Sequence, residues 1–467
     1  MKRFVTPRLV VTGLSGGAGK TINSLGLARA WAEEGKRVAP FKKGPDYIDA
    51  RWLGLAAGTP AYNLDPFFVS DDQLRSLFWD RAHAHDVALI EGNRGLFDGM
   101  DLEGSCSTAA VATALDAPVL LSLDCTKMTR TAAAVVSGIA SFDSQLRLGG
   151  VILNRTAGDR HRSILRQTIE HYTDVPVLGA LPKISPDPIP ERHMGLISNS
   201  EYDGQEQILS RLAQIMRDHT DIDRIWNMAC AAPAPSLAIS PLWDAPCPEP
   251  EVTIGVVRDA AFWFYYEENL EALRRAGARI VELSLLDDAP WPQLDGLYLG
   301  GGFPETFAEA LSRQETVKER VRALARSGLP IYAECGGFMY LTRSVVYNGT
   351  RYDMAGVLDM ETVFTSHPKG LGYVEARVEK DNPFHPVGTV LRGHEFHYSH
   401  CVVDDETRVP GMALNVERGK GTLNGRDGFV QGNVFAGYTH IHALAAPWWA
   451  PNFVEAARRY AAQDGAR

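Results

Sequence analysis

The segment RLVVTGLSGGAGKTINSLGLARAWAEEG, residues 8–35, constrains the fold more than any other part of this chain. Its apolar start predicts a buried strand, and the run that follows Lys20 predicts a helix that ends at Gly35. The glycine-rich loop GLSGGAGKT, residues 13–21, joins the two. A strand that feeds a helix through such a loop is typical of α/β folds, in which the helix N-terminus can bind an anion.

The same alternation of short apolar runs and longer amphipathic runs continues along the chain. In the N-terminal half the strand-like runs are 37–42, 87–92, 118–124 and 148–154. Such runs indicate a parallel sheet covered by helices on both faces. A proline-rich stretch excludes regular helix from 229 to 250, and a second α/β series follows it. We therefore predict two α/β domains, 1–228 and 251–467, joined by a linker over 229–250.

Composition excludes several classes of protein. The formal net charge of −10 leaves no basic stripe for nucleic acid. The six cysteines are scattered without a CxxC pair, which argues against a disulfide framework and against a structural zinc site. The N-terminus lacks a signal-peptide pattern, and no apolar run approaches the roughly 18 residues of a membrane span. We expect a cytoplasmic protein that binds neither nucleic acid nor membrane.

The glycine-rich loop predicts a nucleotide site with ATP and Mg²⁺ as cofactors. Lys20 would reach the β- and γ-phosphates, and the Thr21 hydroxyl would ligate Mg²⁺. Five residues separate Gly13 from Gly19, so the strict four-residue spacing is not met, but the GKT ending and the strand–loop–helix context still favour a phosphate loop. The backbone groups expected to hold the phosphates belong to Gly16, Gly17, Ala18 and Gly19.

Two acidic clusters follow predicted strands. FKKGPDYIDARW contains Asp46 and Asp49, and VALIEGNRGLFDGMD contains Glu91 and Asp98. Ligands bind at the carboxyl edge of an open parallel sheet, and carboxylates there suit Mg²⁺. Any one of the four could instead be a turn former. We predict Asp46 and Glu91 as Mg²⁺ ligands and assign Asp49 and Asp98 to metal or substrate positioning.

Cys335 lies in the segment LPIYAECGGFMYL, residues 329–341. An apolar strand, a cysteine, two glycines and an apolar helix form the pattern of a nucleophile elbow. A lone cysteine is more often a small buried hydrophobe, which is our interpretation of Cys106, Cys125 and Cys401. The surroundings of Cys335 favour a nucleophile instead.

Two other segments supply what such a nucleophile needs. The backbone of LYLGGGFPE, at Gly300, Gly301 and Gly302, would form an oxyanion hole together with Gly336. FAGYTHIHAL offers His440 and His442, and a thiol needs a base because its ordinary pKa is about 8.5.

The segment RGHEFHYSHC, residues 392–401, carries three histidines and a cysteine. Their spacing could indicate a metal site. The alternation of aromatic and polar residues instead predicts a strand with His394 and His400 on one face. We interpret this strand as a polar wall of the active site, with a purely structural role as the alternative.

Taken together, these motifs resemble the cobyrinic acid a,c-diamide synthase family over almost the whole chain. In the N-terminal half the resemblance rests on GLSGGAGKT, FKKGPDYID, NLD at 63–65, EGNRGLFDG, GVILNR and IPERHMGL. In the C-terminal half it rests on GGGFPE, AECGGFMYL, LGY at 371–373, GHEFHYS and YTHIH. GPDYID, IPERHMGL and GHEFHYS are specific to this group, and the other motifs are shared more broadly.

The resemblance implies an N-terminal ATP-dependent domain similar to dethiobiotin synthetase, which also has five residues between its loop glycines. It implies a C-terminal class I glutamine amidotransferase domain of the cobyric acid synthase type, with Cys335 as nucleophile and His440 as base. That type lacks the usual glutamate two residues after the histidine, and His442 stands there. Further implied contacts are Asn154 with adenine, and Tyr47, Arg192 and His193 with substrate.

The implied reaction is ATP- and glutamine-dependent amidation of the a and c acetates of cobyrinic acid in cobalamin biosynthesis, by a monomer or homodimer. Alternatives are the same chemistry on hydrogenobyrinic acid or Ni-sirohydrochlorin, or a cobyric acid synthase, although GPDYID and IPERHMGL favour the a,c enzyme. A partitioning-type ATPase switch is a different class. Such ATPases usually carry a lysine early in the loop, where this chain has Leu14 and Ser15.

Overall fold

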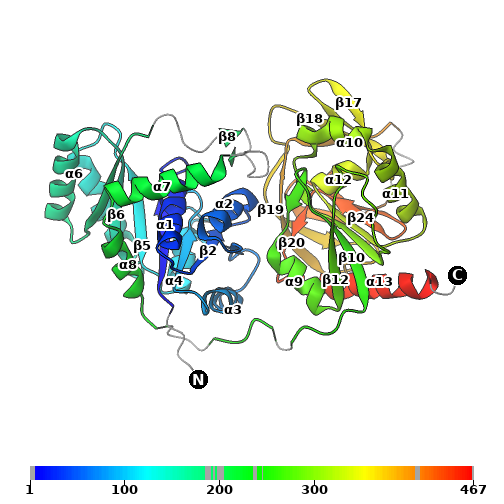
Figure 1. The fold of residues 1–467 in the computed structure, drawn as a ribbon, viewed down its shortest axis with the longest axis horizontal. Coiled ribbons are helices and arrows are strands. Elements are labelled where there is room, and N and C mark those ends of the chain that lie inside the picture. The colour runs from blue at the N-terminus through cyan, green and yellow to red at the C-terminus, as the bar shows by residue number, and fades with distance from the viewer. Residues whose placement is uncertain are drawn as a thin grey trace. The chain divides into compact units, whose positions relative to one another are not determined.

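The computed structural model describes residues 6–184, 191–192, 195–196, 204–234, 239–243, 246–404 and 411–464. The chain divides into two compact units, Met1–Asp244 and Ala245–Arg467, which are drawn from blue to green and from green to red in Figure 1. Each unit is an α/β structure, so the predicted fold class is confirmed.

The first unit is built on seven parallel strands in the order β3-β2-β4-β1-β5-β6-β7. Their bounds are β1 (Arg8–Gly13), β2 (Val38–Lys43), β3 (Tyr62–Leu64), β4 (Val87–Glu91), β5 (Val119–Asp124), β6 (Leu148–Thr156) and β7 (Val177–Pro182). From β1 the chain turns toward β2 and β3 and later passes to β5 on the other side. This reversal of strand order creates a ligand site at the carboxyl end of β1.

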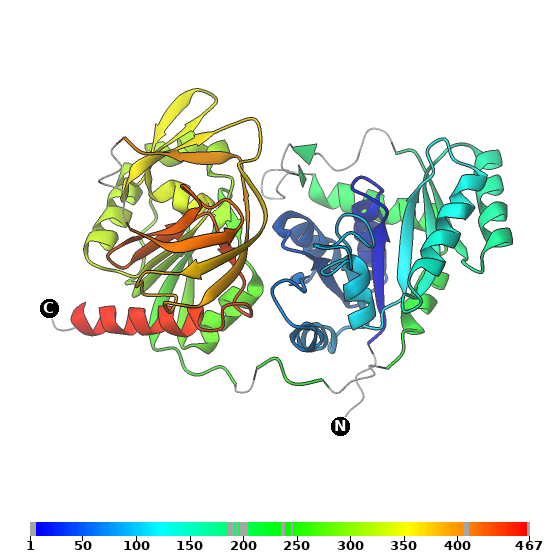
Figure 2. The same cartoon turned by 180° about the vertical axis from the view of Figure 1, so that it is seen from behind.

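Helices cover both faces of this sheet. They are α1 (Lys20–Glu33), α2 (Tyr47–Ala57), α3 (Asp71–Ala82), α4 (Thr108–Ala114), α5 (Arg130–Phe142), α6 (Asp159–Tyr172), α7 (Gln205–His219) and α8 (Ile222–Cys230). Helix α1 packs against α7 on one face (Figure 1), and α4, drawn in cyan, lies on the other (Figure 2). A two-stranded hairpin, β8 (Glu191–Arg192) and β9 (Gly195–Leu196), belongs to the same unit.

The second unit contains a ten-stranded sheet in the order β12-β10-β13-β15-β24-β23-β22-β19-β20-β25. Neighbours from β12 to β24 pair in parallel, and neighbours from β24 to β25 pair antiparallel. The bounds are β10 (Val252–Val257), β12 (Ala278–Leu283), β13 (Gly296–Leu299), β15 (Ile331–Glu334), β19 (Gly370–Val378), β20 (Val390–His397), β22 (Gly411–Arg418), β23 (Arg426–Gln431), β24 (Val434–Gly437) and β25 (His440–Ile441).

Smaller elements surround this sheet. A four-stranded sheet joins β16 (Thr342–Tyr347), β17 (Thr350–Asp353), β18 (Leu358–Phe364) and β21 (Ser399–Val402), and β11 (Phe262–Phe264) pairs with β14 (Gly301–Gly302). The helices are α9 (Glu267–Arg275), the 3-10 helix η2 (Pro304–Phe307), α10 (Ala308–Arg313), α11 (Glu315–Arg326), α12 (Gly336–Leu341) and α13 (Trp449–Asp464). Every residue of α12 is buried, so this helix lies within the core.

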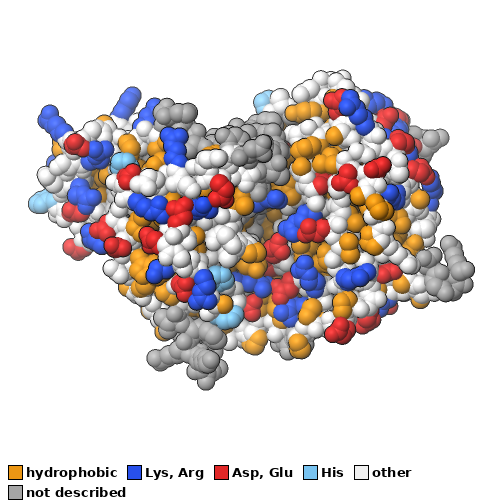
Figure 3. All heavy atoms as spheres, viewed as in Figure 1, with side chains coloured by type: hydrophobic (Ala, Val, Ile, Leu, Met, Phe, Trp, Pro, Cys, Tyr) orange, Lys and Arg blue, Asp and Glu red, His pale blue; other side chains and the backbone are white. Residues whose placement is uncertain are grey.

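The surface shows no single dominant charge on the face drawn in Figure 3, where Lys and Arg side chains are interspersed with Asp and Glu. Among the helices that the structure describes, none is long and apolar enough to cross a bilayer.

Candidate active sites

The phosphate loop lies between β1 and α1, at the carboxyl end of the central strand. Gly19, the residue before α1, has a φ of 93°, in the left-handed region that favours glycine. Asn154 donates from Nδ2 to the Ala18 carbonyl at 3.0 Å, and a Cβ on Gly19 would overlap that amide. Ser122 Oγ donates to the same carbonyl at 2.7 Å. Asn154 therefore supports the loop here, and its contact with adenine stays a prediction.

The Lys20 side chain contacts the backbone of the phosphate loop. Its Nζ donates to the Ser15 carbonyl at 2.7 Å. Burial and the nearby charge of Lys42 lower the pKa of Lys20. No described atom lies within 4 Å of a Cβ built on Gly16 or Gly17, so this part of the loop faces open space. The arrangement offers backbone donors and one ammonium group to an anion.

Glu91 links Thr21, at the end of the phosphate loop, to Lys42 on strand β2. It is the last residue of β4 and is fully buried. Its Oε1 accepts a hydrogen bond from Thr21 Oγ1 at 2.9 Å and another from Lys42 Nζ at 2.8 Å. Its Oε2 is buried and, within the described part of the chain, has no hydrogen-bond partner. Burial raises the pKa of Glu91, while Lys42 opposes that shift.

Lys42 is a site residue that the sequence analysis missed. Its Nζ lies between two carboxylates, 2.6 Å from Asp49 Oδ2 and 2.8 Å from Glu91 Oε1. Burial alone would lower the pKa of Lys42, but Asp49 and Glu91 raise it above its ordinary value. A signal was present, because Lys42 lies near the carboxyl end of β2, in the motif FKKGPDYID.

Asp46, predicted as a Mg²⁺ ligand, uses one oxygen to cap helix α2. Its Oδ1 accepts hydrogen bonds from the backbone N–H groups of Ile48 and Asp49, at 2.9 and 3.0 Å. Burial and the charge of Asp49 raise the pKa of Asp46 to about 7. Tyr47 begins the same helix and is buried. Asp46 therefore lies near Lys42, but one of its two carboxylate oxygens already accepts hydrogen bonds from the first turn of α2.

Asp98, Arg192 and His193 are the remaining predicted substrate residues of this unit. Asp98 Oδ2 accepts from the Gly95 backbone N–H at 3.0 Å, which holds the loop after β4. Arg192 pairs with Gly195 in the β8–β9 hairpin, and β9 contacts α2. The described end of IPERHMGL, at Gly195–Leu196, thus adjoins the helix that begins within GPDYID. His193 lies outside the described residues.

Thr21 and Glu91 are the groups of this site that could hold Mg²⁺. Thr21 and Glu91 already share a hydrogen bond, and the second Glu91 oxygen is buried without a partner in the described ranges. The described residues hold no group of three or more His, Cys, Asp or Glu side chains that could bind a metal by themselves. Mg²⁺ commonly takes one or two carboxylates and completes its shell with phosphate and water. The donor set fits an ion that binds together with nucleotide phosphates.

Cys335 occupies a sharp turn between β15 and α12 in the second unit. Its φ of 47° and ψ of −101° are strained for a residue with a Cβ. Its backbone N–H donates to the Gly437 carbonyl at 2.7 Å, which ties the turn to the end of β24. The thiol is 3% exposed, and burial raises its pKa. A group that accepts the thiol proton is therefore needed for attack.

The glycines predicted as an oxyanion hole adjoin this turn. A Cβ on Gly336 would lie 3.0 Å from the backbone nitrogen of Gly302, and a Cβ on Gly301 would lie 2.5 Å from His440 Cε1. Only glycine at position 301 lets the imidazole approach this closely. Gly300 does not serve as expected, because its N–H donates to the Tyr265 hydroxyl at 2.7 Å and its carbonyl accepts from Gly337.

His440 lies at the start of β25 with its ring enclosed. It is 1% exposed and stacks on His394, with ring centroids 4.8 Å apart and planes at 16°. Its Nδ1 lies 3.5 Å from Oε2 of Glu334, the residue directly before Cys335. The Cε1–Nε2 edge of the ring faces Gly301, with Cε1 the nearer atom. The sequence analysis missed Glu334, although it precedes the predicted nucleophile in AECGG.

His442 has a different environment from His440. Its Nε2 lies 3.7 Å from Glu268 Oε2, and its Nδ1 accepts from the Leu444 backbone N–H at 3.3 Å. Burial lowers its pKa to about 3, so the ring is neutral. The structure brings His440, not His442, beside Gly301, and a catalytic role of His442 stays a prediction.

Both halves of the chain match known protein families. Residues 9–196 match the CobQ/CobB/MinD/ParA nucleotide binding domain, and residues 253–448 match the CobB/CobQ-like glutamine amidotransferase domain. The chain is 43% identical to the cobyrinate a,c-diamide synthase of Magnetococcus marinus, over 95% of this chain and 96% of that protein. It is 40% identical to that of Syntrophotalea carbinolica, over 97% and 99%. The chain belongs to the cobyrinate a,c-diamide synthase family.

In this member of the cobyrinate a,c-diamide synthase family, the segment RGHEFHYSHC forms two strands, not one. Strand β20 ends at His397 in the ten-stranded sheet, and β21 carries His400 into the four-stranded sheet. The expectation that His394 and His400 share a face is wrong, because the chain leaves the first sheet at Tyr398. His394 lines the site by stacking on His440, whereas His397 stacks on Tyr438 at 3.6 Å.

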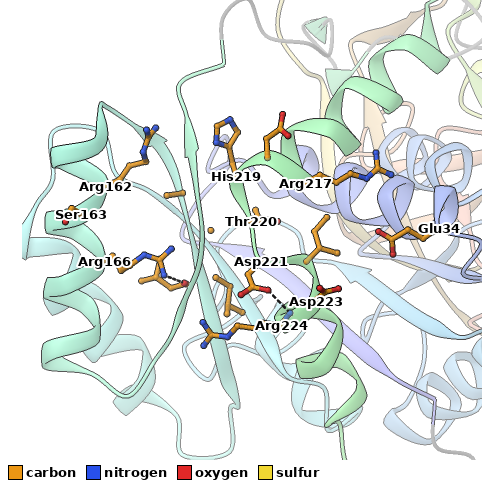
Figure 4. Close-up of a pocket in the computed structure, with 16 residues that line it drawn as sticks. Glu34, Arg162, Ser163, Arg166, Arg217, His219, Thr220, Asp221, Asp223 and Arg224 are labelled. Carbon is orange, nitrogen blue, oxygen red and sulfur yellow. Dashed lines mark hydrogen bonds between the residues drawn. The ribbon is translucent and has the colours of Figure 1, made fainter.

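A cavity of about 950 Å³ opens on the first unit, away from these sites. It is lined by α6, by Val177–Ala180 at the start of β7, and by Arg217–Arg224, which run from the end of α7 into the start of α8 (Figure 4). None of the predicted site residues lines it. Since nucleotides bind at the carboxyl edge of such sheets, a cavity at the amino end of β7 is not the nucleotide site.

Three buried histidines make the second unit sensitive to acid. Burial lowers the pKa of His385 and His442 to about 3 and that of His394 well below its ordinary value. Trp448 Nε1 donates to His385 Nδ1 at 3.3 Å, so His385 Nε2 carries the proton that faces the Tyr332 hydroxyl at 3.1 Å. Charging His385 would break the first of these bonds.

We expect the free energy of unfolding of this unit to fall as the pH drops below about 6.5. In that range the unfolded histidines bind protons that the folded ones do not, at about 1.4 kcal/mol per pH unit for each histidine. Urea unfolding at pH 7.5, 6.0 and 5.0 measures the slope. His385→Gln should reduce it by one histidine's share, and an unchanged slope would contradict the prediction.

Proposed function

We propose that this chain uses ATP and glutamine to amidate the a and c acetate carboxylates of cobyrinic acid. The observation that carries the proposal is the 43% identity to a cobyrinate a,c-diamide synthase over 95% of the chain. The two sites described above supply the two partial reactions that such a ligase needs. The proposal includes cytoplasmic action as a monomer or homodimer.

In the second unit, Cys335 releases ammonia from glutamine. The thiol passes its proton to His440, and the sulfur attacks the side-chain amide carbon. Backbone N–H groups near Gly302 and Gly336 stabilise the oxyanion. The tetrahedral intermediate collapses as its C–N bond breaks and the imidazolium protonates the leaving nitrogen. Water then hydrolyses the glutamyl thioester and regenerates the thiol.

In the first unit, the phosphate loop and Lys20 orient the nucleotide so that its γ-phosphoryl group faces a substrate carboxylate. Transfer gives an acyl phosphate, and ammonia displaces phosphate to leave the amide. Such transfers depend mainly on positioning and on neutralisation of charge. Thr21 and Glu91 would hold Mg²⁺, which supplies charge neutralisation when bound. Lys42 holds Asp49 and Glu91 in place beside it.

The test is a substrate panel. Purified protein is incubated with MgATP, glutamine and either cobyrinic acid, hydrogenobyrinic acid or Ni-sirohydrochlorin. The masses of the products are then measured by mass spectrometry. Two amidations of cobyrinic acid are expected. Preference for another tetrapyrrole would change the assigned substrate. Amidation of more than two carboxylates would indicate a cobyric acid synthase. No amidation of any tetrapyrrole would overturn the proposal in favour of an ATPase switch.

A further inference from the structure

The carboxylate of Glu334 is held against the base of the glutaminase site by groups on two strands. Glu334 ends β15 and is 1% exposed. Its Oε1 accepts from the backbone N–H of Ile441 at 3.1 Å, and its Oε2 accepts from the Tyr298 hydroxyl at 3.0 Å. Oε2 also lies 3.5 Å from His440 Nδ1. The same carboxylate therefore contacts His440 and the residue that follows it.

Within the described ranges, no lysine or arginine forms an ion pair with this buried carboxylate. Among the described residues, the only basic group within ion-pair distance of Glu334 is the imidazole of His440. Burying a carboxylate without a lysine or arginine beside it is costly. Its neighbour in sequence is the nucleophile Cys335, and its neighbour in space is the base.

We propose that Glu334 is the positioning residue of the glutaminase site, which holds His440 in the tautomer with the proton on Nδ1. Nε2, which faces Gly301, is then the atom that takes the thiol proton. When that proton moves from Cys335 to His440, the Glu334 carboxylate stabilises the imidazolium. When the proton passes on to the leaving ammonia, the imidazole returns to its neutral form. Carboxylates in this position orient the imidazole without becoming protonated.

Glu268 and His442 form the competing pair. Their contact is longer, at 3.7 Å, and the Nδ1 of His442 is engaged by the Leu444 backbone. His442 is kept neutral by burial and cannot supply a negative charge to His440. His394 covers one face of the His440 ring and is kept neutral by burial, so it supplies no charge either. Glu334 is thus the carboxylate that contacts the base.

The test compares two isosteric substitutions, Glu334→Gln and Glu268→Gln. Glu334→Gln keeps an acceptor for Ile441 but loses the charge. We expect its kcat for glutamine hydrolysis, measured with all substrates present, to fall about 10²- to 10⁴-fold while KM for glutamine changes less than about threefold. Glu268→Gln, equally buried, should retain activity within about threefold. Amidation with ammonium should be unchanged in both variants, which shows that the first unit is unaffected, and the small change in KM for glutamine shows that the second unit is folded.

A second readout excludes a merely structural effect. Alkylation of Cys335 by iodoacetamide is followed against pH, in the wild type and in Glu334→Gln. Loss of the carboxylate makes the imidazolium less stable, so thiolate formation should begin about one pH unit higher in the variant. Glu334→Asp should recover at least about tenfold of the lost kcat, because it restores the charge.

Full glutamine use by Glu334→Gln, or an unshifted alkylation profile, would overturn the proposal, as would a larger loss in Glu268→Gln. The proposal rests on the glutaminase half of the proposed function. Glutamine hydrolysis and alkylation do not depend on which tetrapyrrole is amidated. A wild type that hydrolyses glutamine but amidates no tetrapyrrole would end the proposed function and still decide the role of Glu334.

Discussion

Cys335→Ala is expected to lower glutamine-dependent amidation about a thousandfold or more, while amidation with ammonium stays within about twofold of the wild type. Alanine removes the sulfur that attacks glutamine but leaves the first unit unchanged. The strained turn is not relieved, because alanine at φ 47° has the same Cβ as cysteine. The measurement is the rate of product formation by mass spectrometry with each nitrogen donor.

The matched control is Cys401→Ala. Cys401 is a buried thiol in the same hydrophobic cluster, and burial likewise raises its pKa. This variant makes the same change in volume without touching the turn after β15, so it should use glutamine normally. Normal glutamine use by Cys335→Ala, or loss of ammonium use in the same variant, would show that the nucleophile has been misassigned.

Lys42→Met is expected to destabilise the first unit by about 3–5 kcal/mol, because it leaves the buried Glu91 and the partly buried Asp49 beside each other without their cation. It should also lower amidation about a hundredfold or more with either nitrogen donor, since the carboxylate beside Thr21 loses its support. Glutamine hydrolysis at Cys335 reports separately that the second unit is folded. Stability is measured by urea unfolding.

Two further variants separate charge from volume. Lys43→Met removes the adjacent buried lysine, which points to the opposite face of the sheet, and should leave the Lys42 cluster intact. Lys42→Met combined with Asp49→Asn should recover part of the lost stability by removing one of the two repelling charges. If the double variant is as unstable as Lys42→Met alone, the predicted repulsion is not the cause of the loss.

Much of the fold could be predicted from local sequence. The run RLVVTG became β1 and the following run became α1, which ends two residues before Gly35. Alternating apolar runs are sufficient for this, since a buried parallel strand must be apolar on both faces. The second unit was harder beyond residue 390, because one alternating run contains a break at Tyr398 that sends its two halves into different sheets.

The candidate sites were predicted only in part. Glycine-rich turns and a cysteine between a strand and a helix are local patterns, and the predictions for Gly19, Lys20, Thr21 and Cys335 came from them. Lys42 and Glu334 were missed because their importance comes from partners that are distant along the chain. Lys42 meets Glu91 49 positions away, and Glu334 at the end of β15 meets His440 at the start of β25, a strand that pairs with β20 and not with β15.

The sequence by itself therefore determined the fold class, the phosphate loop, the nucleophile turn and the family, because each depends on residues that are close together in the chain. The tertiary structure alone decided which charged groups meet. It placed the Lys42 ammonium between two carboxylates, turned His442 toward Glu268, and set Glu334 beside the base. The physical reason is that each of these contacts joins groups from different strands or helices, and only the packing of those elements determines which side chains become neighbours.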